Sequence, residues 1–220
     1  MLIDIHTHKP SQYKSIKSLH FPNEYENLSD ASTAISIGIH PWWAEVEHSE
    51  KFEKLFEQGV PPSVVAIGEC GIDRVRGAAI EVQKTIFHRQ VQLASTFNLP
   101  VIVHQVKGIS DVLHEIKQFP YTVFVFHGYL GNPEQTLQLL KHNVFFSFGE
   151  GLIDYPGKYQ KIIDLIPVEK ILFETDNGQS NLKSIFQAYT QLKSREANEV
   201  ELIVEKSACR IFNLESYGMG

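Results

Sequence analysis

The sequence predicts an α/β fold, specifically a compact (β/α)8 barrel formed as one domain over residues 1–220. Short apolar segments typical of strands alternate with amphipathic segments typical of helices along the whole chain. Several of the expected strands end in a histidine or a carboxylate, and barrels of this class carry their functional residues at those strand ends. No internal repeat, low-complexity tract or Pro/Gly/Ser-rich linker divides the chain.

The strand patterns are clearest where apolar residues run almost without interruption, because strands of a parallel sheet are buried on both faces. Residues 64–69 (VVAIGE) are an example, and residues 34–39 alternate cleanly until Pro41 stops the ladder. Residues 15–20 have the weakest pattern of the series. The predicted strands are 2–8, 15–20, 34–39, 64–69, 101–104, 121–127, 144–148 and 171–176.

Helices are expected where apolar residues recur at three- and four-residue spacing. The longest such segment, residues 80–97, ends where Asn98-Leu99-Pro100 breaks the pattern. Since no long helical pattern follows either of the first two strands, the early βα units of the barrel should be shortened. The predicted helices are 48–58, 80–97, 109–117, 133–141, 158–166, 181–193 and 196–213.

Composition excludes several classes of protein. A chain of 220 residues that is 43% apolar can bury a full core, and it has no apolar run long enough for a membrane span. The start of the chain lacks a signal-peptide pattern, and the two cysteines, Cys70 and Cys209, give no disulfide framework. A reducing cytoplasm is therefore expected. A net charge of −6 argues against binding nucleic acid by bulk electrostatics, and the oligomeric state is left open.

Side chains that bind metals close several of the predicted strands. His6 and His8 lie two positions apart on an extended backbone, so their imidazoles point to the same side and form a chelating pair. A single histidine at a strand end is more commonly a core residue bound to backbone, but metal-binding side chains arriving from five separate strands, with His40 after a sixth, indicate a metal site. The set is His6, His8, His40, Glu69, His104, His127 and Asp176.

The residues of this set differ in how strongly each one alone indicates a metal site. Glu69 and Asp176 are informative individually, because a carboxylate at the end of an apolar strand must be paired, protonated or metal-bound. His40 precedes a proline and two tryptophans, so it is interpreted as shaping the pocket rim, contacting a phosphate or binding metal. His20 ends the weakest strand and is interpreted mainly as a surface residue. Cys70 is interpreted as a small buried residue rather than one that tunes access to the metals.

Motifs spread over nearly the whole chain match one family in the right order. The chain resembles the TatD family of metal-dependent deoxyribonucleases and hydrolases, in the amidohydrolase-like group of barrel enzymes. The resemblance implies a TIM barrel, divalent metals and phosphodiester hydrolysis, chiefly as a DNase of the 3′–5′ exonuclease type. The motifs are IDIHTH (3–8), GIHPWW (38–43), AIGECGID (66–73), FHRQVQLASTFNLPVIVH (87–104), VFHGYLGN (125–132), ILFETDNG (171–178) and ACRIFNL (208–214).

The resemblance also implies roles for individual residues. His6, His8 and Asp176 would hold one divalent ion, His104 and His127 would hold a second, and Glu69 would bridge the two. Two such ions activate a water molecule as the nucleophile, and Asp176 would orient that water and accept its proton. The ligand types admit Zn²⁺, Mn²⁺, Fe²⁺ or Ni²⁺, and Mg²⁺ less readily. The candidates to hold the substrate phosphate are His40, Arg74, Arg76 and Lys107, which lie in predicted βα loops.

The sequence departs from the family pattern near two of these ligands and in its early connections. Gly128 to Asn132 replaces a run of the Phe-Ser-Gly-Ser type, Asn177 to Gln179 lacks the usual Ser-Pro after the aspartate, and the segment between His8 and Gly38 is short. These differences bear on the substrate more than on the chemistry. The leading hypothesis is a nuclease acting on DNA, as single strands or ends. The alternatives are hydrolysis of a small phosphoester, ester, amide or lactone on the same barrel, and a non-catalytic metal-binding protein.

Overall fold

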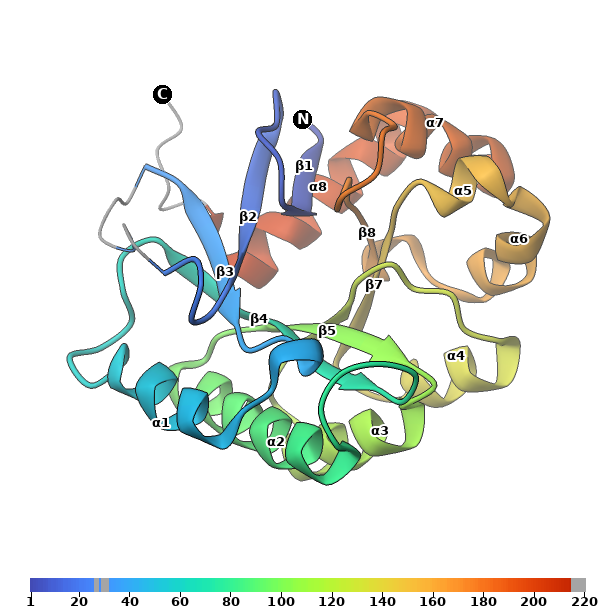
Figure 1. Cartoon of the computed structure of the whole chain (residues 1–220). Helices are drawn as coiled ribbons and strands as arrows, with labels where there is room; N and C mark the ends of the chain where they lie inside the picture. The colour runs from blue at the N-terminus through green and yellow to red at the C-terminus, as the bar shows by residue number, and fades with distance from the viewer. Residues whose placement is uncertain (26–27, 29–31, 215–220) are drawn as a thin grey trace.

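The computed structural model describes residues 1–25, 28 and 32–214. Its eight parallel strands pair in chain order and close into a barrel, with β1 beside β8, as the sequence predicted (Figure 1). The weakly patterned second strand is present and pairs with both of its neighbours. The strands are β1 (Ile3–Thr7), β2 (Lys14–His20), β3 (Ala34–Gly38), β4 (Val64–Asp73), β5 (Val101–Val106), β6 (Phe124–Phe126), β7 (Val144–Phe148) and β8 (Ile171–Phe173).

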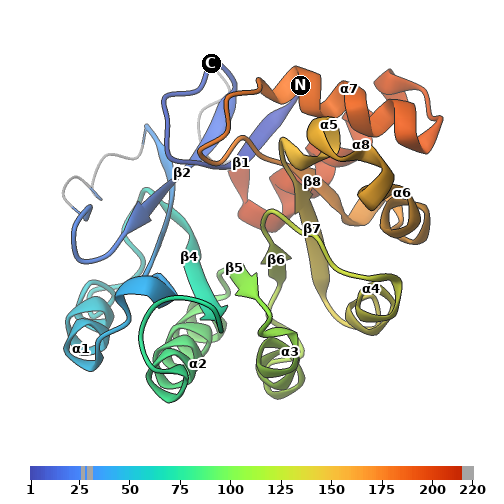
Figure 2. The same ribbon diagram turned by 45° about the vertical axis from the view of Figure 1, so that its right-hand side comes forward.

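Helices cover the barrel unevenly. Figures 1 and 2 show them arranged around the outside of the strands from β4 to β8. In the described part of the chain no helix lies between β1 and β2 or between β2 and β3, so the early units are shortened as predicted. The helices are α1 (Val46–Lys54), α2 (Ile80–Phe97), α3 (Ile109–Gln118), α4 (Pro133–Leu139), α5 (Gly151–Asp154), α6 (Pro156–Leu165), α7 (Leu182–Lys193) and α8 (Ala197–Phe212), with 3₁₀ turns η1 (Pro41–Trp43) and η2 (Val168–Lys170).

Three strands differ in length from the prediction by three or four residues, and the others by two or fewer. β4 extends four residues further, to Asp73, because its pairing with β5 continues through Gly71 and Asp73. β6 begins three residues later than predicted, at Phe124, and β6 and β8 end one and three residues earlier. Gly128 and Asp176 have positive φ angles of 51° and 47°, which turn the chain after these two strands. The short helix α5 was not predicted, since four residues are too few to show a helical period.

Aromatic side chains fill the layer between β8 and the helices. Phe173 is buried and packs edge-on against Tyr189 of α7 and against Phe186, with ring centroids 5.2 and 5.6 Å apart. Each fully buried ring of this kind contributes about 1.5–3 kcal/mol relative to an exposed one. This packing fixes the end of β8, where Asp176 leaves the barrel. In the described residues no helix has the length and apolar composition needed to cross a membrane.

Candidate metal centre

Six histidines form a closed ring around the carboxylate of Glu69. They lie at or just beyond the ends of β1, β2, β3, β5 and β6, and neighbouring ring centroids are 4.5 to 5.5 Å apart. The side chain of Glu69 is 5% exposed, so the surrounding imidazoles shield it from water. In order around the ring, the histidines are His6, His8, His20, His40, His104 and His127.

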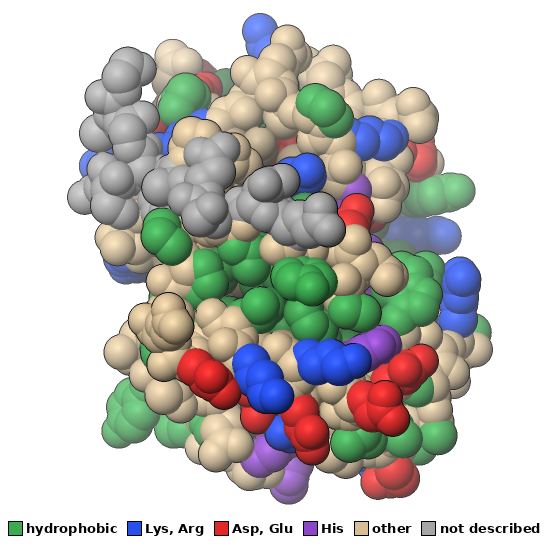
Figure 3. Space-filling view, turned by 60° about the vertical axis from the view of Figure 1, so that its left-hand side comes forward, with side chains coloured by type: hydrophobic (Ala, Val, Ile, Leu, Met, Phe, Trp, Pro, Cys, Tyr) green, Lys and Arg blue, Asp and Glu red, His purple; other side chains and the backbone are tan. Residues whose placement is uncertain are grey.

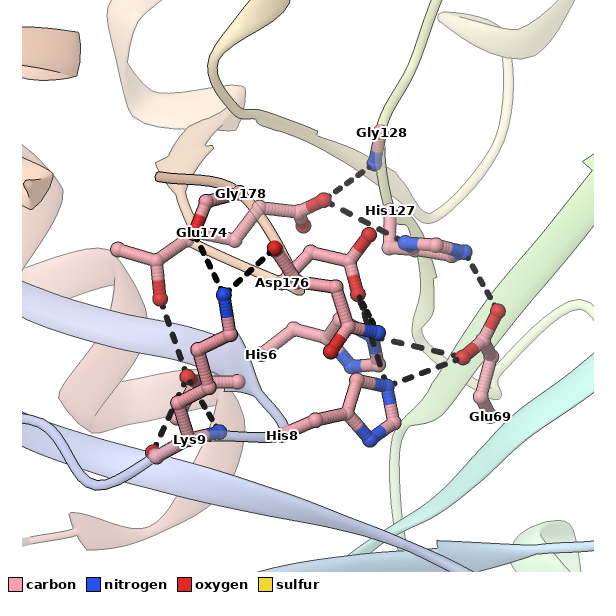
Figure 4. Close-up of polar contacts among 12 residues, drawn as sticks. His6, His8, Lys9, Glu69, His127, Gly128, Glu174, Asp176 and Gly178 are labelled. Carbon is pink, nitrogen blue, oxygen red and sulfur yellow. Dashed lines mark hydrogen bonds and ion pairs between the residues drawn. The ribbon is translucent and has the colours of Figure 1, made fainter. Parts of the chain in front are cut away.

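The two oxygens of Glu69 face different halves of the ring (Figure 4). Asp176 adds a second carboxylate, with Oδ1 3.7 Å from Nε2 of His6 and 3.5 Å from Nε2 of His8. The ring therefore offers two separate groups of donors that share one acid. Oε1 of Glu69 lies 2.6 Å from Nδ1 of His104, 2.8 Å from Nε2 of His127 and 3.2 Å from Nε2 of His40. Oε2 lies 3.5 Å from Nε2 of His6, and 3.7 Å from Nε2 of His8 and of His20.

These residues fit divalent cations. Both ring nitrogens of His6 are buried and lack a hydrogen-bond partner among the described residues. Burying an unpartnered polar atom costs free energy, so this arrangement is explained if a cation fills the space between the donors. Triads of donor atoms lie within 4.8 Å of one another, including His6, His8 and Asp176. Imidazole and carboxylate together suit zinc, manganese, iron, cobalt or nickel.

The outer nitrogens of His104 and His127 contact buried carboxylates. Nε2 of His104 lies 3.4 Å from Oδ2 of Asp73, and Nδ1 of His127 lies 3.4 Å from Oε1 of Glu174. A neutral imidazole that donates its outer N–H to a carboxylate has its inner nitrogen unprotonated. Both inner nitrogens face Oε1 of Glu69, so in the neutral form of each ring the inner nitrogen is the one that would bind a metal.

His40 has the opposite tautomer. Its outer nitrogen, Nδ1, accepts a hydrogen bond from the backbone N–H of Trp42 at 3.1 Å, so Nδ1 is unprotonated. In the neutral ring the proton then lies on Nε2, which points toward Glu69 and His104. Burial lowers the pKa of His40 and favours this neutral form, although Glu69 opposes the shift. His40 is therefore a hydrogen-bond donor in the ring.

The comparisons with known proteins agree with this geometry. Residues 11–213 match the family model described as TatD related DNase. The chain belongs to this TatD family. It is similar to YabD of Bacillus subtilis, an uncharacterized metal-dependent hydrolase, with 28% identity over 197 residues that cover 81% of this chain and 77% of YabD. The resemblance predicted from the motifs is thereby confirmed.

Two Escherichia coli members of the TatD family provide further comparisons. The 3′–5′ ssDNA/RNA exonuclease TatD is 28% identical over 148 residues, which cover 64% of this chain and 56% of the exonuclease. The crystal structure of the TatD homologue YjjV superposes with a TM-score of 0.81 at 21% identity, covering 96% of this chain and 98% of that one. The latter likeness establishes the shared barrel fold.

Burial and charge act in opposite directions on the central acid of this TatD-family ring. Burial disfavours the ionised form of Glu69, but the facing imidazoles of His127 and His104 outweigh it and hold the Glu69 pKa well below its usual range. Glu174 is also fully buried, and its contact with His127 likewise lowers its pKa despite the burial. Both acids are therefore ionised at neutral pH.

A network of hydrogen bonds holds Asp176 beside the ring. Asp4 accepts hydrogen bonds from the backbone N–H and the hydroxyl of Thr175, at 3.0 and 2.7 Å. The backbone N–H of Asp176 donates to the carbonyl of His6 at 2.9 Å. Lys9 donates from Nζ to the carbonyls of Asn177 and Gly178, at 2.7 and 3.0 Å (Figure 4). The turn that carries Asp176 is thus held from both sides by β1 and the loop after it.

Sequence reasoning missed the acids that support the ring. Asp4 and Glu174 lie within or directly after apolar strands, and a charged residue in such a strand is a signal that it has a dedicated partner. Asp73 belongs to a motif that was recognised, but only the extra length of β4 places it beside His104. The interpretation of His20 as a surface residue was wrong, because its side chain is 18% exposed and completes the ring.

The three basic candidates differ in how close they come to this site. The guanidinium of Arg74 binds Asp111 of α3 at 2.8 Å, at a groove between α2 and α3. Arg76 stacks over the ring of Trp42, with its guanidinium carbon 3.7 Å from the centroid, at the rim beside His40. Lys107 lines a cavity of about 440 Å³ together with His127. Arg74 is therefore engaged elsewhere, whereas Arg76 and Lys107 flank the ring.

Proposed function

We propose that this TatD-family chain is a metal-dependent phosphodiesterase that cleaves nucleic acid at single strands or ends. The observation that carries the proposal is the position of Glu69, whose two oxygens face two separate groups of imidazoles. A carboxylate placed in this way suits two cations that share one acid. The family membership and the exonuclease relative support the same class of reaction.

The residues divide into two sets of proposed ligands. His6, His8 and Asp176 would hold one cation, His104 and His127 would hold the other, and Glu69 would contact both. When bound, the two cations supply Lewis acidity, which lowers the pKa of a water molecule and offsets charge on the phosphate. The candidate cations are Zn²⁺, Mn²⁺, Mg²⁺, Fe²⁺ and Ni²⁺.

The chain's own groups would position the substrate and move the proton. The Asp176 side chain is 42% exposed, so it can orient a water molecule at the mouth of the site and accept its proton. The Nε2–H of His40 points toward the centre of the ring and would donate a hydrogen bond to a non-bridging oxygen of the substrate phosphate. Lys107 and the cavity beside His127 would accommodate the rest of the substrate. Arg76, at the rim, is a further candidate for a phosphate contact.

The surface charge favours a substrate that is recognised at the metal centre. On the face drawn in Figure 3, acidic and basic side chains are interspersed, without a broad basic area among the described residues visible there. The net charge is −6. Long duplexes bind mainly by neutralising phosphates over an extended surface, so short strands and ends are favoured instead. A cytoplasmic location stays an expectation.

A second candidate is hydrolysis of a small phosphoester, ester or amide at the same site. Two loops next to proposed ligands differ from the family pattern. After His127, Tyr129 is buried and bonds Thr136 through its hydroxyl at 2.9 Å, which closes part of that loop. After Asp176, Lys9 fixes the carbonyls of Asn177 and Gly178. In barrel enzymes, changes in the loops around the site commonly change the substrate while the chemistry stays the same.

An activity panel separates the two candidates. Purified protein would be stripped with EDTA, reloaded with one metal at a time, and assayed on single-stranded DNA, a generic phosphodiester, and a set of esters and amides. The proposal expects metal-dependent cleavage of DNA and of the phosphodiester. Turnover of the generic phosphodiester, esters or amides without cleavage of DNA would favour the second candidate. Absence of metal-dependent turnover on every phosphoester would overturn the first.

A further inference from the structure

His20 is the member of the ring that neither the motifs nor the proposed reaction explains. It ends β2, which lies between β1 and β3, so its imidazole comes between those of His8 and His40. The Nε2 atom of His20 is buried and has no hydrogen-bond partner among the described residues. A structural histidine would normally bond backbone or a side chain through such an atom.

The spacing around Nε2 of His20 is suited to shared coordination. Nε2 lies 3.7 Å from Oε2 of Glu69, which is too long for a hydrogen bond. Two atoms that each lie about 2.1 Å from the same metal ion are separated by roughly 3–4 Å. Nε2 of His8 lies at the same 3.7 Å from Oε2, and the three donor atoms fall within 4.8 Å of one another.

Packing holds the His20 ring in this orientation. The indole of Trp43 lies against it, with ring centroids 5.0 Å apart, and the same indole lies 5.2 Å from the ring of His40. His40 is the next residue in the ring. Its outer nitrogen accepts the Trp42 N–H, so in the neutral ring its inner nitrogen carries the proton. His40 therefore donates, whereas no such bond among the described residues occupies the inner nitrogen of His20.

We propose that His20 is a third imidazole ligand of the cation held by His6 and His8. This inference rests on the two-cation arrangement of the proposed function. It gives the first position three imidazoles and two carboxylates, compared with two imidazoles and the shared Glu69 at the second. Because imidazole binds late first-row metals far better than it binds Mg²⁺, the first position is selective for ions such as Zn²⁺, Co²⁺ or Ni²⁺.

Metal titration of a His20→Gln variant tests the inference without any substrate. Calorimetric titration with Zn²⁺ and with Mg²⁺ measures both positions in the stripped protein. We expect Zn²⁺ affinity at one position to fall by about tenfold or more, as loss of groups that shape a site typically does, with little change for Mg²⁺. The matched control is His114→Gln, an exposed histidine of α3, which keeps the affinities of the unaltered chain. Identical Zn²⁺ affinities in His20→Gln and the control would overturn the inference.

A second variant tests coordination directly and does not depend on affinity. In His20→Cys loaded with Co²⁺, a thiolate at position 20 that binds the ion gives a thiolate-to-cobalt charge-transfer band in the near ultraviolet. The unaltered chain, which retains Cys70 and Cys209, provides the baseline without that band. Absence of the band in a folded, cobalt-loaded variant would contradict direct ligation. These readouts stand apart from catalysis, so a protein that binds metal as described but cleaves no phosphoester refutes only the proposed function.

Discussion

The two halves of the histidine ring hold their imidazoles in different ways. In the half next to the helix-covered strands, His104 and His127 each contact a buried carboxylate through the outer nitrogen. In the half next to β1 and β2, where the described chain has no intervening helix, both nitrogens of His6 lack a partner. One half is thus preorganised by acids behind the ligands, whereas the other gathers more donors, from His20 and the exposed Asp176.

The difference shows two ways to fix the geometry of a metal site: carboxylates that bind the outer nitrogens of the ligands, or additional donor atoms that face the ion. Carboxylates behind an imidazole set its tautomer and orientation before any ion arrives. Where additional donor atoms face the ion instead, the ligands take their final orientation when the ion binds. The first three predictions below each remove a group that belongs to both halves or to one half, and the last probes the strand that carries Glu69.

Replacing Glu69 by glutamine should have the largest effect, because Glu69 is the acid that both halves share. The amide keeps the shape but loses the charge, and its NH₂ cannot coordinate a cation. We expect activity to fall by orders of magnitude while the protein stays folded, as measured by steady-state rates and thermal melting. A rate close to that of the unaltered chain would show that Glu69 is not shared between two ions.

Replacing Asp176 by asparagine should weaken metal binding only in the half of the ring near β1. We expect turnover to be lost, because the amide cannot accept the proton of the attacking water. The donors around His104 and His127 are untouched, so at least one metal should remain bound after dialysis, as counted by elemental analysis. Retained activity would remove the proposed base role of Asp176.

Replacing Glu174 by glutamine should weaken the other half through a residue that touches no substrate. Glu174 accepts from the backbone N–H of Gly128 at 2.7 Å and faces Nδ1 of His127. Losing its charge should lower metal affinity at the second position by about 10–100-fold. Titration that resolves the two positions is the measurement, and Glu169→Gln, at an exposed site, is the control. Equal weakening of both positions would contradict the division of the ring.

The sequence predicted the proposed ligands, which belong to family motifs, better than the residues that support them. The predicted apolar strands end at or beside the residues of this set, and the barrel topology brings the C-terminal parts of those strands to one face; the set is His6, His8, Glu69, His104, His127 and Asp176. His20 was misread because its strand is weakly patterned, and the pairing that places it cannot be read from local sequence. Asp73 depends on where β4 ends, and Arg74 on a partner 37 residues away. These outcomes are set by tertiary contacts rather than by local pattern.

The smallest effect concerns Cys70, the residue after Glu69 on β4, whose thiol contacts the carbonyl of Ile102 at 3.9 Å. Its thiol is fully buried, and burial raises its pKa, so almost no reactive thiolate forms at pH 8. We expect iodoacetamide to modify the half-buried Cys209 of α8 and to spare Cys70 until the protein is denatured, as mapped by peptide mass spectrometry. Repeating the labelling after EDTA treatment sharpens the comparison. Continued protection would show that packing alone keeps Cys70 buried, whereas labelling only after chelation would show that bound metal stabilises the strand that carries Glu69.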